Sequence, residues 1–308
     1  MFCVEPKDGI CNYQSLKMPG FGDGINLLLN AHAILMKGES VNRCLFAAMH
    51  LKKRFGQHFL KDENNAKRVA DAVQLWGIDY NHLVEIGPGG GALTKFLVQN
   101  KTENQDLSLV EIDKDLINNL EGSYAEQGVR VLNVDFLKAD LSLLKGAFGV
   151  CGNFPYNISS QILFRVLEHK HNVPEVVGMF QKEVAQRVAA LHGSKTYGIL
   201  SVLVQAYYTV ESVMVLKPGA FNPPPKVDSM VIRLKRTKSK IDGLNEKKFF
   251  KLVKAAFGQR RKTLRNSIKV FVTDKDEHLK TQLEPILQRR AEQLSVDEFI
   301  WLTRQLSD

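Results

Sequence analysis

Asn153-Phe-Pro-Tyr156 carries the residue types best suited to chemistry in this chain. The four residues follow the apolar run 148–152 and precede 157–160, a pattern that predicts a strand followed by a helix start. An exocyclic amine on a base such as adenine is a poor nucleophile, because its lone pair is delocalised into the ring. The Asn153 side-chain oxygen and a nearby backbone carbonyl could accept hydrogen bonds from that amine while Tyr156 stacks on the base. The alternative is an ordinary turn, since Pro155 presets φ.

A glycine-rich turn, Gly87-Pro-Gly89-Gly-Gly91, directly follows the first strong predicted strand, 82–86. Glycine lets the backbone approach a ligand closely, and the N-terminus of the following helix contributes its dipole. By itself such a turn suits a dinucleotide as well as any other nucleoside cofactor. We expect Gly87 and Gly89 to contact the cofactor.

Polar side chains end the next three predicted strands: Glu111 the second, Asp135 the third and Asn153 the fourth. The carboxyl ends of parallel strands meet at one edge of an open α/β sheet, where ligands bind. Glu111 is then placed to accept from both ribose hydroxyls of a nucleoside, and Asp135 from an adenine amine. An NAD-type oxidoreductase would share the glycines and Glu111, but it would not need the sequence at Asn153.

Short apolar runs alternate with helical periodicity over most of the chain, which predicts βαβ units in a mostly parallel α/β sheet of seven strands. The predicted strands are 82–86, 107–112, 129–134, 149–153, 176–181, 212–216 and 230–234. Helices are predicted at 62–75, 94–99, 115–124, 159–169, 182–191 and 197–207. The last two strands, joined by a Pro-rich stretch, could form an antiparallel hairpin at one edge. A small all-helical domain follows, with helices at 246–257, 262–271, 277–287 and 295–306.

The sequence divides into three parts at 1–48, 49–240 and 244–308. Residues 1–48 carry four basic and four acidic side chains, so the net charge of +9 belongs to the remainder. We interpret 1–48 as a poorly ordered extension, with Met49 as a candidate translation start; a partner-binding arm is the alternative. No apolar run reaches the roughly 18 residues that span a bilayer, and no membrane association is expected.

The basic balance indicates a polyanionic partner, nucleic acid before membrane. Residues 247–269 hold nine basic side chains and no acid, which favours phosphate binding. Within that run Phe249, Phe250, Val253 and Phe257 have the spacing of core residues. The four cysteines, at positions 3, 11, 44 and 151, form no C-x-x-C pair, which argues against a zinc site or a disulfide scaffold and fits a reducing cytosol.

The combined motifs resemble the KsgA-type small-subunit rRNA adenine dimethyltransferases, from about Leu51 to the C-terminus. The shared segments begin at Arg54 (Arg-Phe-Gly-Gln-His-Phe-Leu), Glu85 (Glu-Ile-Gly-Pro-Gly), Asn153 (Asn-Phe-Pro-Tyr-Asn-Ile-Ser), Phe221 (Phe-Asn-Pro-Pro-Pro-Lys-Val-Asp-Ser) and Ala256 (Ala-Phe-Gly-Gln-Arg-Arg-Lys-Thr-Leu-Arg-Asn). The resemblance implies a Rossmann-like methyltransferase domain at 49–240 and a helical RNA-binding domain at 244–308.

The resemblance also implies S-adenosylmethionine as the cofactor and assigns site residues. Cofactor contacts are implied for His58, Leu60, Gly87, Glu111, Asp135 and Asn153, and catalysis for Asn153, Pro155 and Tyr156. His58 stands where many members of the family have Asn; both side chains can donate a hydrogen bond. The implied reaction adds two methyl groups to N6 of each of two adjacent adenines in the 3′-terminal hairpin loop of small-subunit rRNA, within a pre-30S particle in the cytoplasm. A monomer without a metal is expected.

The expected RNA contacts are Phe221, Lys226, Arg260, Arg261, Lys262 and Arg265. Phe221 could clamp a flipped base opposite Tyr156, or it could be a hydrophobic plug at the sheet edge. Two alternatives to the leading function are a large-subunit rRNA methyltransferase of the macrolide-resistance type and an RNA-binding assembly factor with dispensable catalysis. The Gln-Arg-Arg-Lys-Thr-Leu-Arg run from Gln259 favours the small-subunit enzyme over the first alternative.

Overall fold

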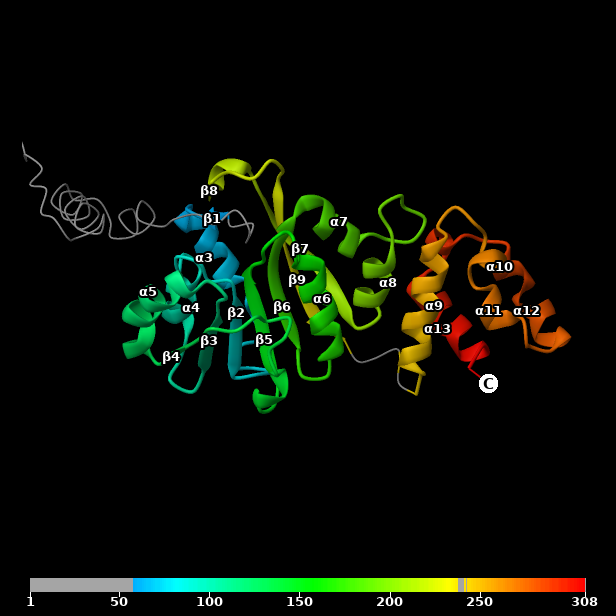
Figure 1. Ribbon diagram of the computed structural model, residues 1–308, viewed down its shortest axis with the longest axis horizontal. Helices are drawn as coiled ribbons and strands as arrows, with labels where there is room; N and C mark the ends of the chain where they lie inside the picture. The colour runs from blue at the N-terminus through cyan, green and yellow to red at the C-terminus, as the bar shows by residue number, and fades with distance from the viewer. Residues whose placement is uncertain (1–57, 238–240, 242, 308) are drawn as a thin grey trace, which may run out of the picture. The chain divides into compact units, whose positions relative to one another are not determined.

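A seven-stranded mixed sheet forms the centre of the protein (Figure 1). The computed structural model describes residues 58–237, 241 and 243–307. Along the sheet the strand order is β4-β3-β2-β5-β6-β9-β7. The bounds are His82–Ile86 (β2), Asp106–Val110 (β3), Val129–Leu132 (β4), Phe148–Asn153 (β5), Glu175–Gln181 (β6), Tyr208–Leu216 (β7) and Ser229–Arg236 (β9). Neighbours from β4 to β6 are parallel, and β9 is antiparallel to both β6 and β7.

The helices between the strands cover the sheet. They are α3 (Glu63–Asp71), α4 (Thr94–Asn100), α5 (Lys114–Tyr124), α6 (Ser159–Glu168), α7 (Lys182–Ala189) and α8 (Ile199–Gln205). Acidic caps fix two of the starts: Asp62 accepts from the backbone amide of Asn65 at 3.0 Å, and Asp113 accepts from that of Asp115. Leu83, Val84, Val150 and Cys151 are buried, as expected for strands covered on both faces.

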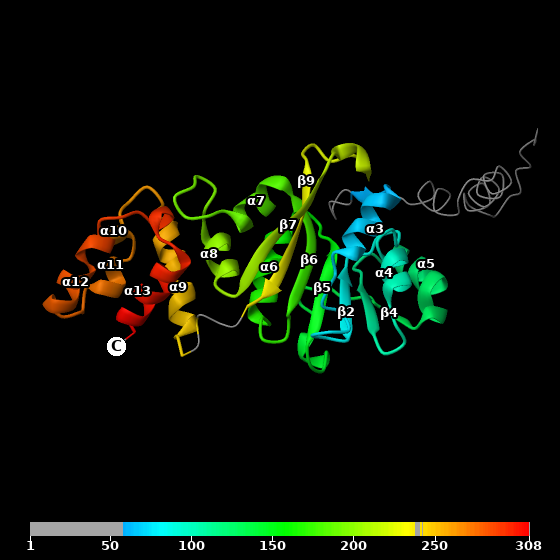
Figure 2. The ribbon, with the colours of Figure 1, turned by 180° about the vertical axis from the view of Figure 1, so that it is seen from behind.

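The Pro-rich stretch produces an arrangement that the sequence only partly predicts. The antiparallel pairing of β7 and β9 confirms the expected hairpin, with β7 at the edge and β9 between β7 and β6 (Figure 2). A second, two-stranded sheet was not expected: β8 (Phe221–Asn222) pairs antiparallel with β1 (Phe59–Leu60). Strands of two residues are too short to show a period in the sequence.

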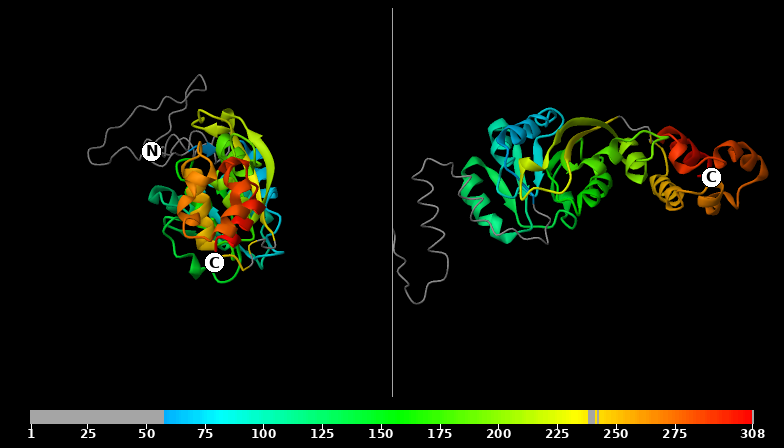
Figure 3. Two further views of the ribbon diagram at one scale, coloured as in Figure 1. Left: turned by 90° about the vertical axis from the view of Figure 1, so that its right-hand side faces the viewer. Right: turned by 90° about the horizontal axis from the view of Figure 1, so that it is seen from above.

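Helices α9 to α13 follow the sheet, and no strand is found within 243–307 (Figure 3). Their bounds are Glu246–Gly258 (α9), Leu264–Ser267 (α10), Lys269–Val272 (α11), Glu277–Leu287 (α12) and Val296–Gln305 (α13). The single helix predicted at 262–271 is instead two short ones, because Ile268 leaves helical geometry with φ −113° and ψ 19°. Phe249 and Val253 are fully buried and Phe250 and Phe257 partly so, which confirms their assignment to the core.

Helix α9 contacts α8, and one hydrophobic core includes side chains from the sheet, from α8 and from the C-terminal helices. The proposed division between 240 and 244 therefore crosses a continuous apolar interior. The extension at 1–48 and Arg54, where the first shared segment begins, lie outside the described residues. None of the helices in the described part of the chain has the length and apolar character to cross a membrane.

Candidate active site

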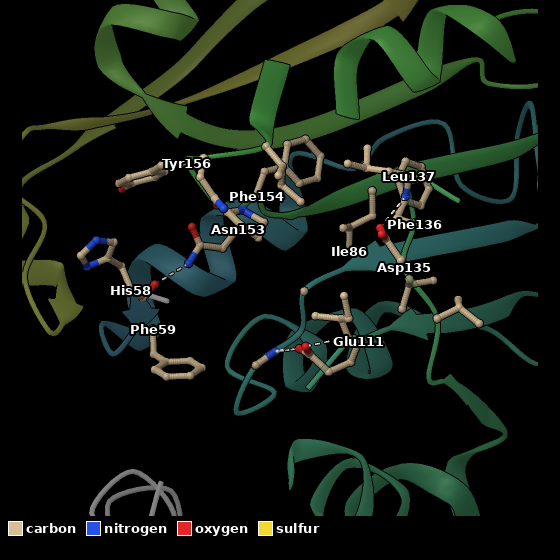
Figure 4. Close-up of a pocket in the computed structure, with 18 residues that line it drawn as sticks. His58, Phe59, Ile86, Glu111, Asp135, Phe136, Leu137, Asn153, Phe154 and Tyr156 are labelled. Carbon is tan, nitrogen blue, oxygen red and sulfur yellow. Dashed lines mark hydrogen bonds between the residues drawn. The ribbon is translucent and has the colours of Figure 1, made fainter. Parts of the chain in front are cut away.

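A cavity of about 250 Å³ opens where β2, β3, β4 and β5 end (Figure 4). The structure brings into its wall every predicted cofactor or catalytic residue except Leu60. These are His58, Gly87, Gly89, Glu111, Asp135, Asn153, Pro155 and Tyr156. Four consecutive parallel strands end at this edge. The prediction that their carboxyl ends meet at one edge of the sheet is therefore confirmed.

The glycine turn after β2 allows the backbone to approach the cavity closely. Gly87 has φ +65° and Gly89 has φ +59°, and residues other than glycine rarely adopt such backbone angles. A Cβ atom built on Gly89 would lie 2.6 Å from Cε1 of Phe59, so glycine is also required by the packing of that ring. Phe59, which sequence reasoning missed, therefore forms one wall of the cavity.

Glu111 is held rigidly beside this turn. Its Oε1 accepts hydrogen bonds from the backbone amides of Ile112 and Asp113, each at 2.9 Å, and its Oε2 lies 3.3 Å from the amide of Gly89. Burial raises the pKa of the Glu111 carboxyl, and the backbone hydrogen bonds oppose that rise. Because Oε1 already has two donors, Oε2 is the atom with acceptor capacity for a ligand hydroxyl.

A second buried carboxyl lies under the site. Glu85, in β2, is 1% exposed and accepts a hydrogen bond from Oγ1 of Thr94 at 2.7 Å. Burial raises its pKa to about 8, because the charged form loses its hydration. Glu85 does not line the cavity, and it holds the start of α4 against the strand.

Asp135 lies three residues beyond the end of β4 at Leu132, so the predicted strand to Val134 was too long. Its Oδ1 accepts from the backbone amide of Leu137 at 3.0 Å, and the carboxylate faces the cavity. Ile112 and Val134 are 49% and 39% exposed there, which is unusual for side chains of their kind. Both side chains line the same cavity as Asp135. Sequence reasoning missed both residues, because each lay inside a strand predicted too long.

Asn153 is the last residue of β5, and its Nδ2 donates to the main-chain carbonyl of His58 at 2.7 Å. A carbonyl can only accept, so this contact determines which end of the amide is the nitrogen. The oxygen of Asn153 consequently faces the cavity on the side of Tyr156 (Figure 4). An acceptor is therefore fixed where the sequence argument required one.

Tyr156 lies in the turn between β5 and α6, at the wall of the cavity. Its hydroxyl is 2.5 Å from Oγ of Ser229, and burial raises its pKa. The His58 ring lies beside it, with ring centroids 5.4 Å apart and planes inclined by 31°. The His58 ring in turn donates from Nδ1 to the carbonyl of Pro223 at 2.8 Å. The Tyr156 side chain is therefore held by Ser229 at its hydroxyl and by the His58 ring at its side.

Comparison with known proteins identifies the family. The family model described as Ribosomal RNA adenine dimethylase matches residues 48–306. The chain belongs to this family. Proteins named Ribosomal RNA small subunit methyltransferase A from Cytophaga hutchinsonii and Flavobacterium johnsoniae are similar to it. The first is 48% identical over 257 residues, covering 83% of this chain and 97% of that protein, and the second is 46% identical over 258 residues, covering 83% and 95%.

Solved structures of two related proteins share the fold. A dimethyladenosine transferase from Plasmodium falciparum aligns with a TM-score of 0.68 at 24% identity, covering 81% of this chain and 96% of that one. The 23S rRNA methyltransferase ErmE aligns with a TM-score of 0.64 at 22% identity, covering 81% and 100%. The Rossmann-like methyltransferase fold is thus confirmed.

In this ribosomal RNA adenine dimethylase, Leu60 and Phe221 are paired with each other in the small β1–β8 sheet. They are 4% and 1% exposed, and neither lines the cavity. The prediction that Phe221 clamps a base is therefore wrong for this conformation, because strand pairing turns its ring into the interior. The alternative of a hydrophobic plug describes it better. Lys226, further along, is exposed.

The predicted RNA-binding residues of the helical part differ in whether their side chains form ion pairs with acidic residues. Arg260 is paired with Glu292 at 2.7 Å, and Arg265 with Glu284. Arg261 and Lys262 are exposed. The run that lacks acids in the sequence is thus partly neutralised by acids from later segments, which the linear pattern could not show. Within the described residues, no His, Cys, Asp or Glu side chains gather in a group of three or more that could hold a metal.

Proposed function

We propose that this ribosomal RNA adenine dimethylase transfers methyl groups from S-adenosylmethionine to N6 of two adjacent adenines in the 3′-terminal hairpin loop of small-subunit rRNA. Each adenine would receive two methyl groups, within a pre-30S particle. The orientation of the Asn153 amide carries the proposal, because it presents a neutral acceptor to an exocyclic amine. The names of relatives at 48% and 46% identity support the small subunit as the substrate.

The cavity wall fits S-adenosylmethionine in the chemistry of its groups. Asp135 suits the amine of an adenine and the apolar side chains of Ile112 and Val134 in the same wall suit its ring, while Oε2 of Glu111 suits a ribose hydroxyl. The glycine turn leaves room for the amino-acid portion, since Gly87 and Gly89 carry no side chain. Bound S-adenosylmethionine would supply a methyl group bonded to a sulfonium sulfur, and that sulfur would leave as the neutral thioether of S-adenosylhomocysteine.

The residues of the chain would then orient the attacking amine rather than deprotonate it strongly. Oδ1 of Asn153 and a nearby backbone carbonyl would accept from the two N–H groups, which favours a tetrahedral nitrogen. Pro155 packs against the Gly87 turn and fixes the backbone between Asn153 and Tyr156. Stacking on Tyr156 would hold the base in place, so positioning and exclusion of water account for the catalysis.

For the RNA we assign binding to Lys226, Arg261 and Lys262, which are exposed cations, with smaller contributions from the paired Arg260 and Arg265. The catalytic part would comprise 49–240 and the RNA-binding part 244–308. Function as a monomer in the cytoplasm belongs to the same proposal, and no metal is part of it.

The decisive experiment is radiolabelled methyl transfer from S-adenosylmethionine to undermethylated 30S subunits. Parallel reactions would contain 50S subunits or free rRNA, and mass spectrometry would identify the modified nucleoside. Dimethyladenosine in 30S RNA alone is the expected result. Label in free large-subunit RNA would instead indicate the macrolide-resistance type of enzyme. Tight binding to 30S without any label would indicate an assembly factor.

A further inference from the structure

One hydrogen bond at the site involves a residue outside the assignments above. Ser229 is the first residue of β9 and is fully buried, and its Oγ lies 2.5 Å from the hydroxyl of Tyr156. The two residues are 73 positions apart in the chain. Ser229 belongs to the segment from Phe221 that resembles the family, yet nothing in the proposed chemistry uses its side chain.

The backbone at Ser229 is fixed on both sides. It pairs with Gln181 of β6 and with Leu216 of β7, so it lies inside the sheet rather than at an edge. The preceding residue, Asp228, is held as well: its carbonyl accepts from the amide of Lys182 at 2.9 Å, and its carboxylate pairs with Lys217 at 2.9 Å. Ser229 is therefore a rigid anchor point.

Tyr156 needs such an anchor, because it lies in a turn rather than in a helix or a strand. The His58 ring contacts one side of the tyrosine ring at a tilt of 31°. The bond to Ser229 holds the opposite, para end of the ring. The bond to Ser229 fixes where the axis of the Tyr156 ring points, and the contact with the His58 ring limits rotation about that axis.

We propose that Ser229 is a positioning residue, which holds the Tyr156 ring at the place where a stacked adenine presents its amine to Asn153. The inference rests on the proposed function, because it assumes that Tyr156 stacks on the adenine. Without the Ser229 hydroxyl the ring shifts from this place, and the stacked base presents its amine in the wrong position. Binding of the RNA is affected little, since phosphate contacts supply most of it.

The test is single-turnover methylation of 30S subunits by wild type, Ser229→Ala, Tyr156→Phe and the double variant. Ser108→Ala is the matched control: Ser108 is also buried in a strand and has a 2.8 Å hydrogen bond, to His82. We expect Ser229→Ala to lower the transfer rate roughly tenfold, with dissociation constants for 30S and for S-adenosylhomocysteine within about twofold of wild type. The double variant should be no slower than Tyr156→Phe alone, because both changes remove one interaction.

Two results would overturn the inference: a Ser229→Ala rate equal to that of Ser108→Ala, or rate losses that multiply in the double variant. If Ser229→Ala does not fold, Tyr156→Phe removes the same bond from the cavity side and should show the same slower rate at unchanged affinity. A wild-type enzyme without transfer to 30S would refute the proposed function instead. The shifts in melting temperature of the same four proteins would then still show whether the two hydroxyls are coupled.

Discussion

Nδ2 of Asn153 and the main-chain oxygen of His58 lie 2.7 Å apart, although 95 positions separate the residues in the chain. The contact joins the end of β5 to the segment that enters β1. The contact determines the orientation of the Asn153 amide, because the His58 carbonyl accepts only from the amide nitrogen and so leaves the amide oxygen for a ligand. The hydrogen-bonding polarity of the site is therefore set by backbone from a distant segment.

Replacing Asn153 by alanine should reduce methyl transfer by about 100-fold or more, since a fixed polar partner of the reacting group is lost. Affinity for RNA should stay within about twofold. Asn172→Ala is the control, because Asn172 also uses its amide nitrogen on a backbone carbonyl, that of Gly146, but is not part of the cavity wall. Single-turnover rates and filter binding measure the two quantities. Full activity in Asn153→Ala would refute the assigned role.

Gly89→Ala should weaken binding of S-adenosylhomocysteine by about tenfold or more, measured by calorimetry. The added methyl group would displace the Phe59 ring from the cavity wall, and the positive φ adds strain. Gly122→Ala, in α5, is the control: nothing lies within 4 Å of its added carbon, and alanine favours a helix. Equal affinities in the two variants would contradict the account of the Gly89 turn.

Glu85 should make the protein less stable as pH rises from about 5 to 8. Its pKa is about 8 in the fold against an ordinary 4.5, so the folded state binds the extra proton in this window. The contribution to the free energy of unfolding then falls by at most about 1.4 kcal/mol per pH unit. Urea unfolding of Glu85→Gln across this range should show a flatter dependence. Glu103→Gln, at an exposed position, should retain the wild-type slope.

Arg261 and Lys262 should contribute more to RNA binding than their neighbour Arg265. Alanine at both positions should lower the slope of log affinity against log salt by about 1.5, as expected for two lost phosphate contacts. Arg265→Ala should change it less, because Glu284 already pairs with that guanidinium. Affinity for 30S at several salt concentrations measures this. A larger loss for Arg265→Ala would mean that the ion pair opens on binding.

The sequence predicts well where periodicity is long and residue types are distinctive. Strand β2 and helix α12 were predicted to the residue, and the motif beginning at Asn153 lies where a sheet edge was expected. The local spacing of apolar residues, polar residues and glycines is enough to predict the positions of such elements.

What the sequence could not show depends on distant contacts. The sequence left Phe221 as either a base clamp or a hydrophobic plug, and only the folded structure shows that its ring is buried, in a strand paired with Leu60. The sequence did not show that the Arg260 side chain forms an ion pair with Glu292. Ser229 lay within a segment that resembles the family, but the sequence did not show its role, which depends on the tyrosine that it meets in the fold.

Strand β9 lies inside the sheet although it is the last strand to be made. As the chain leaves the ribosome, β6 keeps an unpaired apolar edge, and β7 has no partner, until residues 229–236 emerge. Tyr156 meets Ser229 only at that stage, so a nascent chain that ends before residue 229 lacks the proposed anchor of the Tyr156 ring. An enzyme proposed to act on maturing ribosomes would thus complete the support of its own site only after β9 is made.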